Sequence, residues 1–215
     1  MPEASKGLMK TLAKSFPLLG AIFPIFGIGI ACVVNWVGNY DKYQNQIKGL
    51  NMLTGQQTGW LYLGCWFYCR TVAWLNFYPL GYKEQVMGGG NMRANVYVYK
   101  IIGQGDFKNA VVLQDEGVMG QYNRAGRSLT HFLENCTPLI VCFIMTPLVY
   151  GYISFIFVVL ACLGRVIHQI GYSGEKGFGP HTGGFVLANA CQEIMVGMLL
   201  IIAIQGAWVE KKIQI

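Results

Sequence analysis

Two arginines, a histidine and a glutamate stand just before a stretch of sequence that carries no charge. They are Arg124, Arg127, His131 and Glu134, and the stretch that follows, residues 135–164, has no aspartate, glutamate, lysine or arginine. On a helix that turns about 100° per residue, the four side chains fall within an arc of about 80° and share one face. Arginine binds carboxylates with paired hydrogen bonds and glutamate binds amines, so this face has the chemistry to hold a small zwitterion.

A second polar set follows the uncharged stretch. Arg165, His168 and Tyr172 also share one helical face, within an arc of about 60°. The short turn at 147–151 makes the two apolar segments antiparallel, so we expect both polar faces at the same end of the hairpin. Ionisable residues inside a membrane span usually face the bundle interior or a wet cavity and have a function.

A purely structural role for these residues is the alternative interpretation. Arg124 and Arg127 would then reach lipid headgroups, and Glu134 with Arg165 would form a buried ion pair that fixes helix register. A single pair is enough to fix a register. The convergence of seven polar groups therefore favours a ligand site.

The elements that must position these residues are apolar helices. The chain of 215 residues is 53% hydrophobic and 12% charged, about half the charged fraction of a soluble domain. This composition predicts an all-α, polytopic membrane bundle. We expect the chain to cross the membrane in five apolar segments: 17–37, 58–80, 131–148, 150–172 and 184–208.

Charge bias sets the expected orientation. With five crossings, the N-terminal tail, region 81–127 and loop 173–183 lie on one side with ten lysines and arginines, against four on the other. The positive-inside rule makes the first side cytoplasmic. We predict that the apolar segment after the basic N-terminus is retained as an extra transmembrane segment within 1–57, and that 58–215 forms a second unit with a long 81–122 connection. The alternating stretch 95–101 predicts a short strand.

Several classes of site are disfavoured. The net charge of +6 is spread along the chain without a dense basic tract, so nucleic acid is not an expected partner. The seven cysteines are scattered, and the closest pair, Cys65 and Cys69, lies in an apolar stretch with no second ligand pair nearby. We expect these cysteines to pack as small hydrophobic residues and predict no metal site.

The motifs resemble those of the family of membrane-associated proteins in eicosanoid and glutathione metabolism (MAPEG), which includes microsomal glutathione transferases and prostaglandin E synthase. That family carries two arginines, an asparagine, a glutamate and a proline in its second helix. Here the same spacing reads Arg124, Arg127, His131, Glu134 and Pro138, with "FLEN" two residues before the proline. The family's third helix ends in R-x-x-H-x-x-x-Y, matched by "RVIHQIGY" at 165–172. The resemblance covers residues 58–208.

The resemblance implies a four-helix MAPEG-like core that forms a homotrimer, with glutathione held between subunits on the cytoplasmic side. The residues expected to bind glutathione are Arg127, His131, Glu134, Arg165, His168 and Tyr172. We expect membrane lipids and a lipophilic substrate as further partners. The expected location is the endoplasmic reticulum membrane, with a mitochondrial or other organelle membrane as the alternative.

The chain also departs from the family pattern. His131 replaces the asparagine, and Pro180 is followed by His181 where the family has an arginine that stabilises the thiolate. We therefore predict that Tyr172 stabilises the thiolate, with cationic help from Arg124 or His181. Two functions stay open: a glutathione-dependent transferase or peroxidase acting on lipophilic electrophiles, and a non-catalytic subunit of a larger membrane complex. A small channel is weaker, because the polar groups gather at one end of the hairpin.

Overall fold

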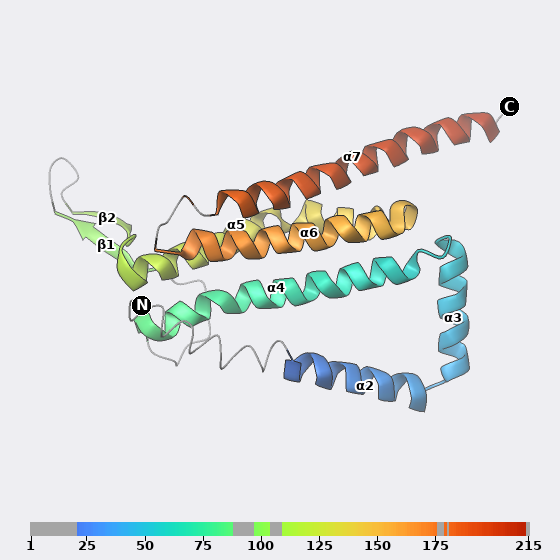
Figure 1. Ribbon diagram of the computed structural model, residues 1–215, viewed down its shortest axis with the longest axis horizontal. Coiled ribbons are helices and arrows are strands. Elements are labelled where there is room, and N and C mark those ends of the chain that lie inside the picture. The colour runs from blue at the N-terminus through green and yellow to red at the C-terminus, as the bar shows by residue number, and fades with distance from the viewer. Residues whose placement is uncertain (1–20, 88–96, 104–108, 176–178, 180, 214–215) are drawn as a thin grey trace.

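The chain folds mostly into long helices, with one small β-hairpin (Figure 1). The computed structural model describes residues 21–87, 97–103, 109–175, 179 and 181–213. The elements in this part of the chain are α2 (Phe23–Val37), α3 (Tyr40–Leu53), α4 (Thr58–Met87), β1 (Tyr99–Ile102), β2 (Ala110–Leu113), α5 (Gly117–Met145), α6 (Pro147–Ser173) and α7 (Thr182–Ile213). The predicted helical bundle is confirmed. Strand β1 overlaps the stretch 95–101 that was expected to form a strand, and β2 is an addition to the expected fold.

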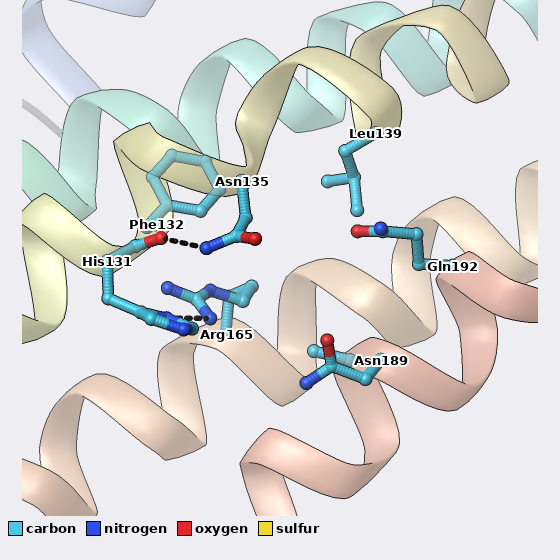
Figure 2. A pocket seen from close by; sticks show the side chains of 8 residues that line it. His131, Phe132, Asn135, Leu139, Arg165, Asn189 and Gln192 are labelled. Atoms are coloured by element: carbon cyan, nitrogen blue, oxygen red, sulfur yellow. Dashed lines mark hydrogen bonds between the residues drawn. The ribbon is translucent and has the colours of Figure 1, made fainter.

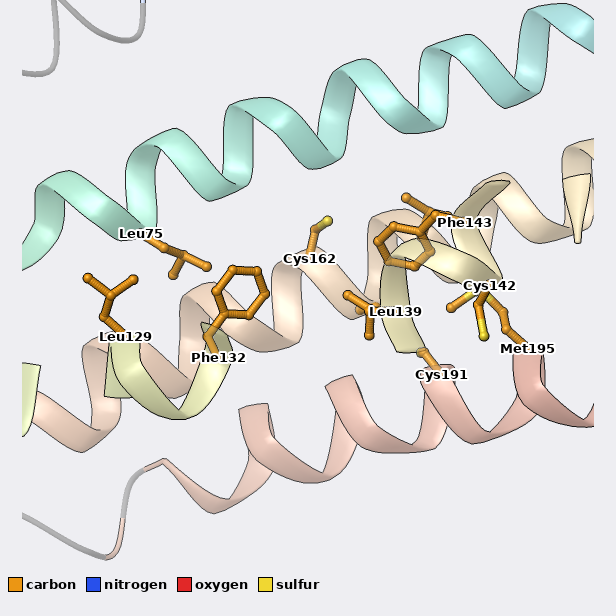
Figure 3. Packing of buried hydrophobic residues seen from close by; sticks show 11 residues of the cluster. Leu75, Leu129, Phe132, Leu139, Cys142, Phe143, Cys162, Cys191 and Met195 are labelled. Atoms are coloured by element: carbon orange, nitrogen blue, oxygen red, sulfur yellow. The ribbon is translucent and has the colours of Figure 1, made fainter. Parts of the chain in front are cut away.

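Helices α4, α5, α6 and α7 form the bundle that carries the core. Helix α4 packs on α5 and α6, while α7 packs mainly on α6. Each of the four helices contributes buried apolar side chains to one cluster, including Leu75, Phe132, Phe143, Val158 and Met195 (Figure 3). The α5–α6 turn is tight, and Gly151 near the start of α6 has a φ of +37° that favours glycine.

Three described helices, α5, α6 and α7, are long and apolar enough to cross a membrane, and the bent pair α2 and α3 counts as a fourth at most. The chain is therefore an integral membrane protein by the length and composition of its helices. The expected five crossings are not confirmed. Segment 58–80 lies in α4, a helix of 30 residues, but polar residues such as Arg70 and Asn76 lower its hydropathy below that of the other three.

Of the expected N-terminal span 17–37, residues 17–20 lie outside the described residues. Within the described part, α2 has 15 residues, and it counts as a candidate span only together with α3. The chain then bends by 106° into α3. Helix α3 lies across the end of the bundle opposite the β-hairpin (Figure 1). Asn39 starts α3 by accepting a hydrogen bond from the backbone N–H of Lys42 at 3.0 Å.

The polar connection 81–122 is described over residues 81–87, 97–103 and 109–122, and these include helix and strand. Helix α4 continues to Met87 and α5 begins at Gly117, so part of this connection is helical. Of the predicted strand 95–101, residues 95–96 lie outside the described residues, and the strand itself starts at Tyr99. It pairs antiparallel with β2. Outside the spans, Lys100 donates a hydrogen bond to Asp115 and thereby holds the pKa of that carboxyl below its ordinary value.

One buried side chain fastens the hairpin to α5. Asn123 accepts a hydrogen bond from the backbone N–H of Val98 at 2.9 Å, and it donates to the carbonyls of Val98 at 2.6 Å and Gln114 at 2.7 Å. Both strand ends are thus held by a single amide. This contact positions the hairpin over the first turns of α5.

We expect Asn123→Ala to release the hairpin without unfolding the bundle. The change leaves the Val98 N–H without its partner, at a local cost of about 2 kcal/mol or more. Hydrogen exchange of residues 97–114 should accelerate about 30-fold while α6 stays protected. The matched control is Asn76→Ala, because the Asn76 amide bonds only Val72 in its own helix. Equal protection of the hairpin in both variants would contradict this role.

Candidate functional site

Polar side chains from three helices meet at the hairpin end of the bundle. The rings of His168 and Tyr172, one turn apart on α6, stack at a centroid distance of 5.6 Å. His181, which directly precedes α7, lies edge-on to both rings, at 5.2 Å from His168 and 5.1 Å from Tyr172. His168 and His181 are buried. The structure thus brings together three residues that sequence reasoning placed in the site.

Arg165 is a buried cation in this site. Its residue is 7% exposed, and its guanidinium lies 5.1 Å from the centroid of the Phe132 ring. Nη1 lies 3.4 Å from Nδ1 of His131 (Figure 2), and Nη2 donates to the Ser128 carbonyl at 3.4 Å. Nε has no hydrogen-bond partner, and no carboxylate of a described residue lies within ion-pair distance of this guanidinium.

The carboxylate of Glu134 pairs with a different arginine. Its Oε1 lies 3.2 Å from Nη1 of Arg127, and both side chains are about half exposed. The alternative interpretation, in which Glu134 and Arg165 fix the helix register, is therefore wrong. An exposed pair separated by two helical turns contributes little to stability. It leaves both charges accessible at the surface of α5.

Arg124 is held by backbone carbonyls. Its Nη1 donates to the carbonyl of Asp115 at 2.6 Å, and Nη2 donates to the carbonyl of Gly174 at 3.0 Å. These bonds join the segment before α5 to the end of α6. Two nitrogens of the Arg124 guanidinium are therefore used to hold these segments together beside the site.

A narrow cleft opens beside Arg165 between α5 and α7. Its lining includes Asn135 on α5 and Asn189 and Gln192 on α7 (Figure 2). The cavity volume is about 10 Å³, about what one water molecule needs. Sequence reasoning missed these three amides. The sequence does indicate them, because they are polar residues within otherwise apolar segments. Asn189 and Gln192 are also three residues apart, which places them on one helical face.

Glycines set the position of α7 against α6. A Cβ at Gly184 would lie 2.4 Å from the backbone nitrogen of His168, and one at Gly164 would lie 2.6 Å from that of Ala188. The two backbones therefore approach too closely for any side chain. This approach brings Phe185 within ring contact of His131 and His168, at 5.9 Å and 5.7 Å.

The described residues include no group of three or more histidines, cysteines, aspartates or glutamates that could hold a metal ion. Pro180, part of the departure from the family motif, lies outside the described residues. Comparison of the chain with protein-family models, curated proteins and solved structures finds no match. The site geometry and the quoted motifs are therefore the grounds for assigning a function.

Proposed function

We propose that this chain is an integral-membrane glutathione-dependent transferase or peroxidase that acts on lipophilic electrophiles. The observation that supports it most is Arg165, a buried cation with no carboxylate partner among the described residues. An uncompensated charge inside a membrane protein is costly and marks a functional site. A ligand carboxylate would supply the missing anion, with two parallel hydrogen bonds from the guanidinium.

The binding mode follows from the size of the cleft and from the exposed pair on α5. The cleft beside Arg165 is too small for a tripeptide, so the ligand carboxylate would lie at its mouth next to His131, with both oxygens toward the guanidinium. The rest of glutathione would lie outside the cleft, where Arg127 and Glu134 offer a cation and an anion that pair with each other at 3.2 Å in the free chain. A zwitterionic γ-glutamyl group carries the two complementary charges.

The chemistry requires a stabilised thiolate, since the thiolate is the nucleophile. We propose that the Tyr172 hydroxyl donates a hydrogen bond to the sulfur. His181 lies against the Tyr172 ring and would orient it, while Arg124 acts mainly through its carbonyl contacts. The thiol proton would leave to water at the membrane surface. The sulfur then bonds to the electrophilic carbon, and the electron pair of the broken bond leaves with the leaving group.

Turnover of a general lipophilic thiol acceptor tests the enzymatic proposal. We expect the purified chain to be active near neutral pH, because a hydrogen-bonded thiolate has a pKa below the ordinary value of about 8.5. Tyr172→Phe should lower kcat about 100-fold and change KM little, as expected for a group that acts on developing charge. A wild-type chain that binds glutathione without turning over any electrophile or hydroperoxide would exclude the enzyme.

The second candidate is a non-catalytic subunit of a larger membrane complex that keeps a glutathione site. Two observations favour it: His181 stands where the family has a catalytic arginine, and Arg124 is bound to two carbonyls. Purification in mild detergent distinguishes the candidates, because a subunit would copurify with other chains and an enzyme with copies of itself. The homotrimer and the endoplasmic reticulum membrane remain part of the first proposal.

A further inference from the structure

Two exposed, opposite charges lie within apolar stretches of the bundle. Arg70 is on α4 and Glu193 is on α7, and both residues are exposed. Neither makes an ion pair or a hydrogen bond with any residue that the structure describes. A charge that faces lipid is strongly unfavourable, so such residues normally pair with one another or with another protein.

Helix α6 packs on both α4 and α7, so the depths of Arg70 and Glu193 in the bundle can be compared through the α6 residues beside them. Helices α4 and α6 run in the same direction, because Trp60 lies against Tyr152 at their beginnings and Tyr78 bonds Ser173 near their ends. Between these contacts, a Cβ at Gly64 would lie 3.8 Å from the Val158 side chain. The paired residues differ in number by 92 to 95, so Arg70 is level with residues 162–165 of α6.

Helix α7 runs antiparallel to α6, with Gly184 against His168 and Gly164 against Ala188. Glu193 lies five residues beyond Ala188. It is therefore level with residue 159 of α6. The levels of Arg70 and Glu193 differ by three to six residues, or about 5–9 Å along the helix axis, a distance that the two long side chains can bridge.

The two charges cannot meet within one copy of the chain. Helices α4 and α7 lie on opposite sides of α6 (Figure 1). We propose that α7 of one copy docks on α4 of a second copy in the same membrane orientation, with Glu193 of the first paired to Arg70 of the second. Such an interface joins two different surfaces, so repeating it about an axis along the membrane normal closes a ring.

The surroundings of both charges fit an interface between helices. On α4, Tyr62 and Trp66 are exposed next to Arg70, and on α7, Val196 and Leu200 are exposed next to Glu193. Helix α2 has no buried residues and packs chiefly on α3, so it leaves α4 open. Apolar side chains would surround the ion pair and exclude lipid and water from it. This proposal does not depend on glutathione, and it would stand if the function proposed above failed.

A charge-reversal experiment on the full chain tests the pairing. Native mass spectrometry in mild detergent should find the wild type as an oligomer of this chain. Arg70→Glu and Glu193→Arg should each raise the dissociation constant about tenfold or more, and the double variant should restore the wild-type value. Lys48→Glu on α3 is the control and should leave the oligomer intact. If a reversed charge prevents membrane insertion, the neutral variants Arg70→Gln and Glu193→Gln take the place of the reversed ones. Each of them should also weaken the oligomer.

Three results would overturn the proposal. A monomeric wild type would remove the interface, and an oligomer unaffected by either single change would show that the charges lie outside it. If Glu134→Arg rescues Arg70→Glu and Glu193→Arg does not, the partner of Arg70 is Glu134 on α5 and not Glu193.

Discussion

Arg165→Gln should abolish glutathione binding while the protein becomes no less stable. The guanidinium is buried without a carboxylate partner among the described residues. Removing a buried, uncompensated charge relieves its desolvation cost, whereas removing the cation that meets one of the two ligand carboxylates costs about 2 kcal/mol or more of binding. The dissociation constant for glutathione should therefore rise about 30-fold or more. Retention on immobilised glutathione and the unfolding temperature in detergent measure the two effects.

Arg165→Lys is the matched control, because it keeps the charge and loses the forked geometry. We expect intermediate binding, since one ammonium cannot make two parallel hydrogen bonds to a carboxylate. A merely structural arginine would behave differently. In that case Arg165→Gln would lower the unfolding temperature, because the contacts with Ser128 and Phe132 would be lost, and would leave glutathione retention unchanged.

Gly184→Ala should destabilise the α6–α7 pair and disrupt the site. The new Cβ would lie 2.4 Å from the His168 nitrogen and 2.6 Å from the Gly164 carbonyl oxygen, and both are backbone atoms that cannot move aside alone. Helix α7 must shift, which separates His181 and Phe185 from His168. We expect a loss of about 3 kcal/mol in unfolding free energy, at the upper end for overpacking, and weaker glutathione binding.

The adjacent glycine supplies the control. A Cβ at Gly183 would meet no atom within 4 Å, so Gly183→Ala should stay within about 0.5 kcal/mol of the wild type. Unfolding of both variants by a denaturant series in detergent compares them directly. Similar stabilities for the two variants would mean that α6 and α7 do not pack as closely as described.

The helical periodicity of the sequence predicted much of the site, since the faces carrying His131, Arg165, His168 and Tyr172 do converge. It could not predict which partner each charge selects. Glu134 shares its predicted helical face with two arginines, and it pairs with Arg127, two turns away on α5. Arg124 was expected to act in catalysis, yet its nearest acceptors are the carbonyls of Asp115 and Gly174. The spacing of residues in the sequence does not indicate such contacts between a side chain and the backbone.

The fold was predictable where the hydrophobic pattern is long and was not where it is short. The uncharged run from 135 to 164 indicated a helical hairpin, and α5 and α6 form it. The first turns of α5, residues 117–122, were assigned to the polar connection, because they carry no apolar pattern of their own and are packed through contacts within the fold. Helix α3 was missed for a similar reason: its apolar residues face outward at the end of the bundle and are too few to mark a span.

A calorimetric titration of the wild-type chain with glutathione in mild detergent measures the proposed binding itself. We expect saturable binding with a fixed number of glutathione molecules per chain, weakened by added salt, because arginine and glutamate side chains meet the ligand's charges. The glutathione diester, whose carboxylates are blocked, should bind at least about 30-fold more weakly. Absence of binding heat for glutathione, or equal affinity for glutathione and its diester, would contradict the assignment of this three-helix site to glutathione.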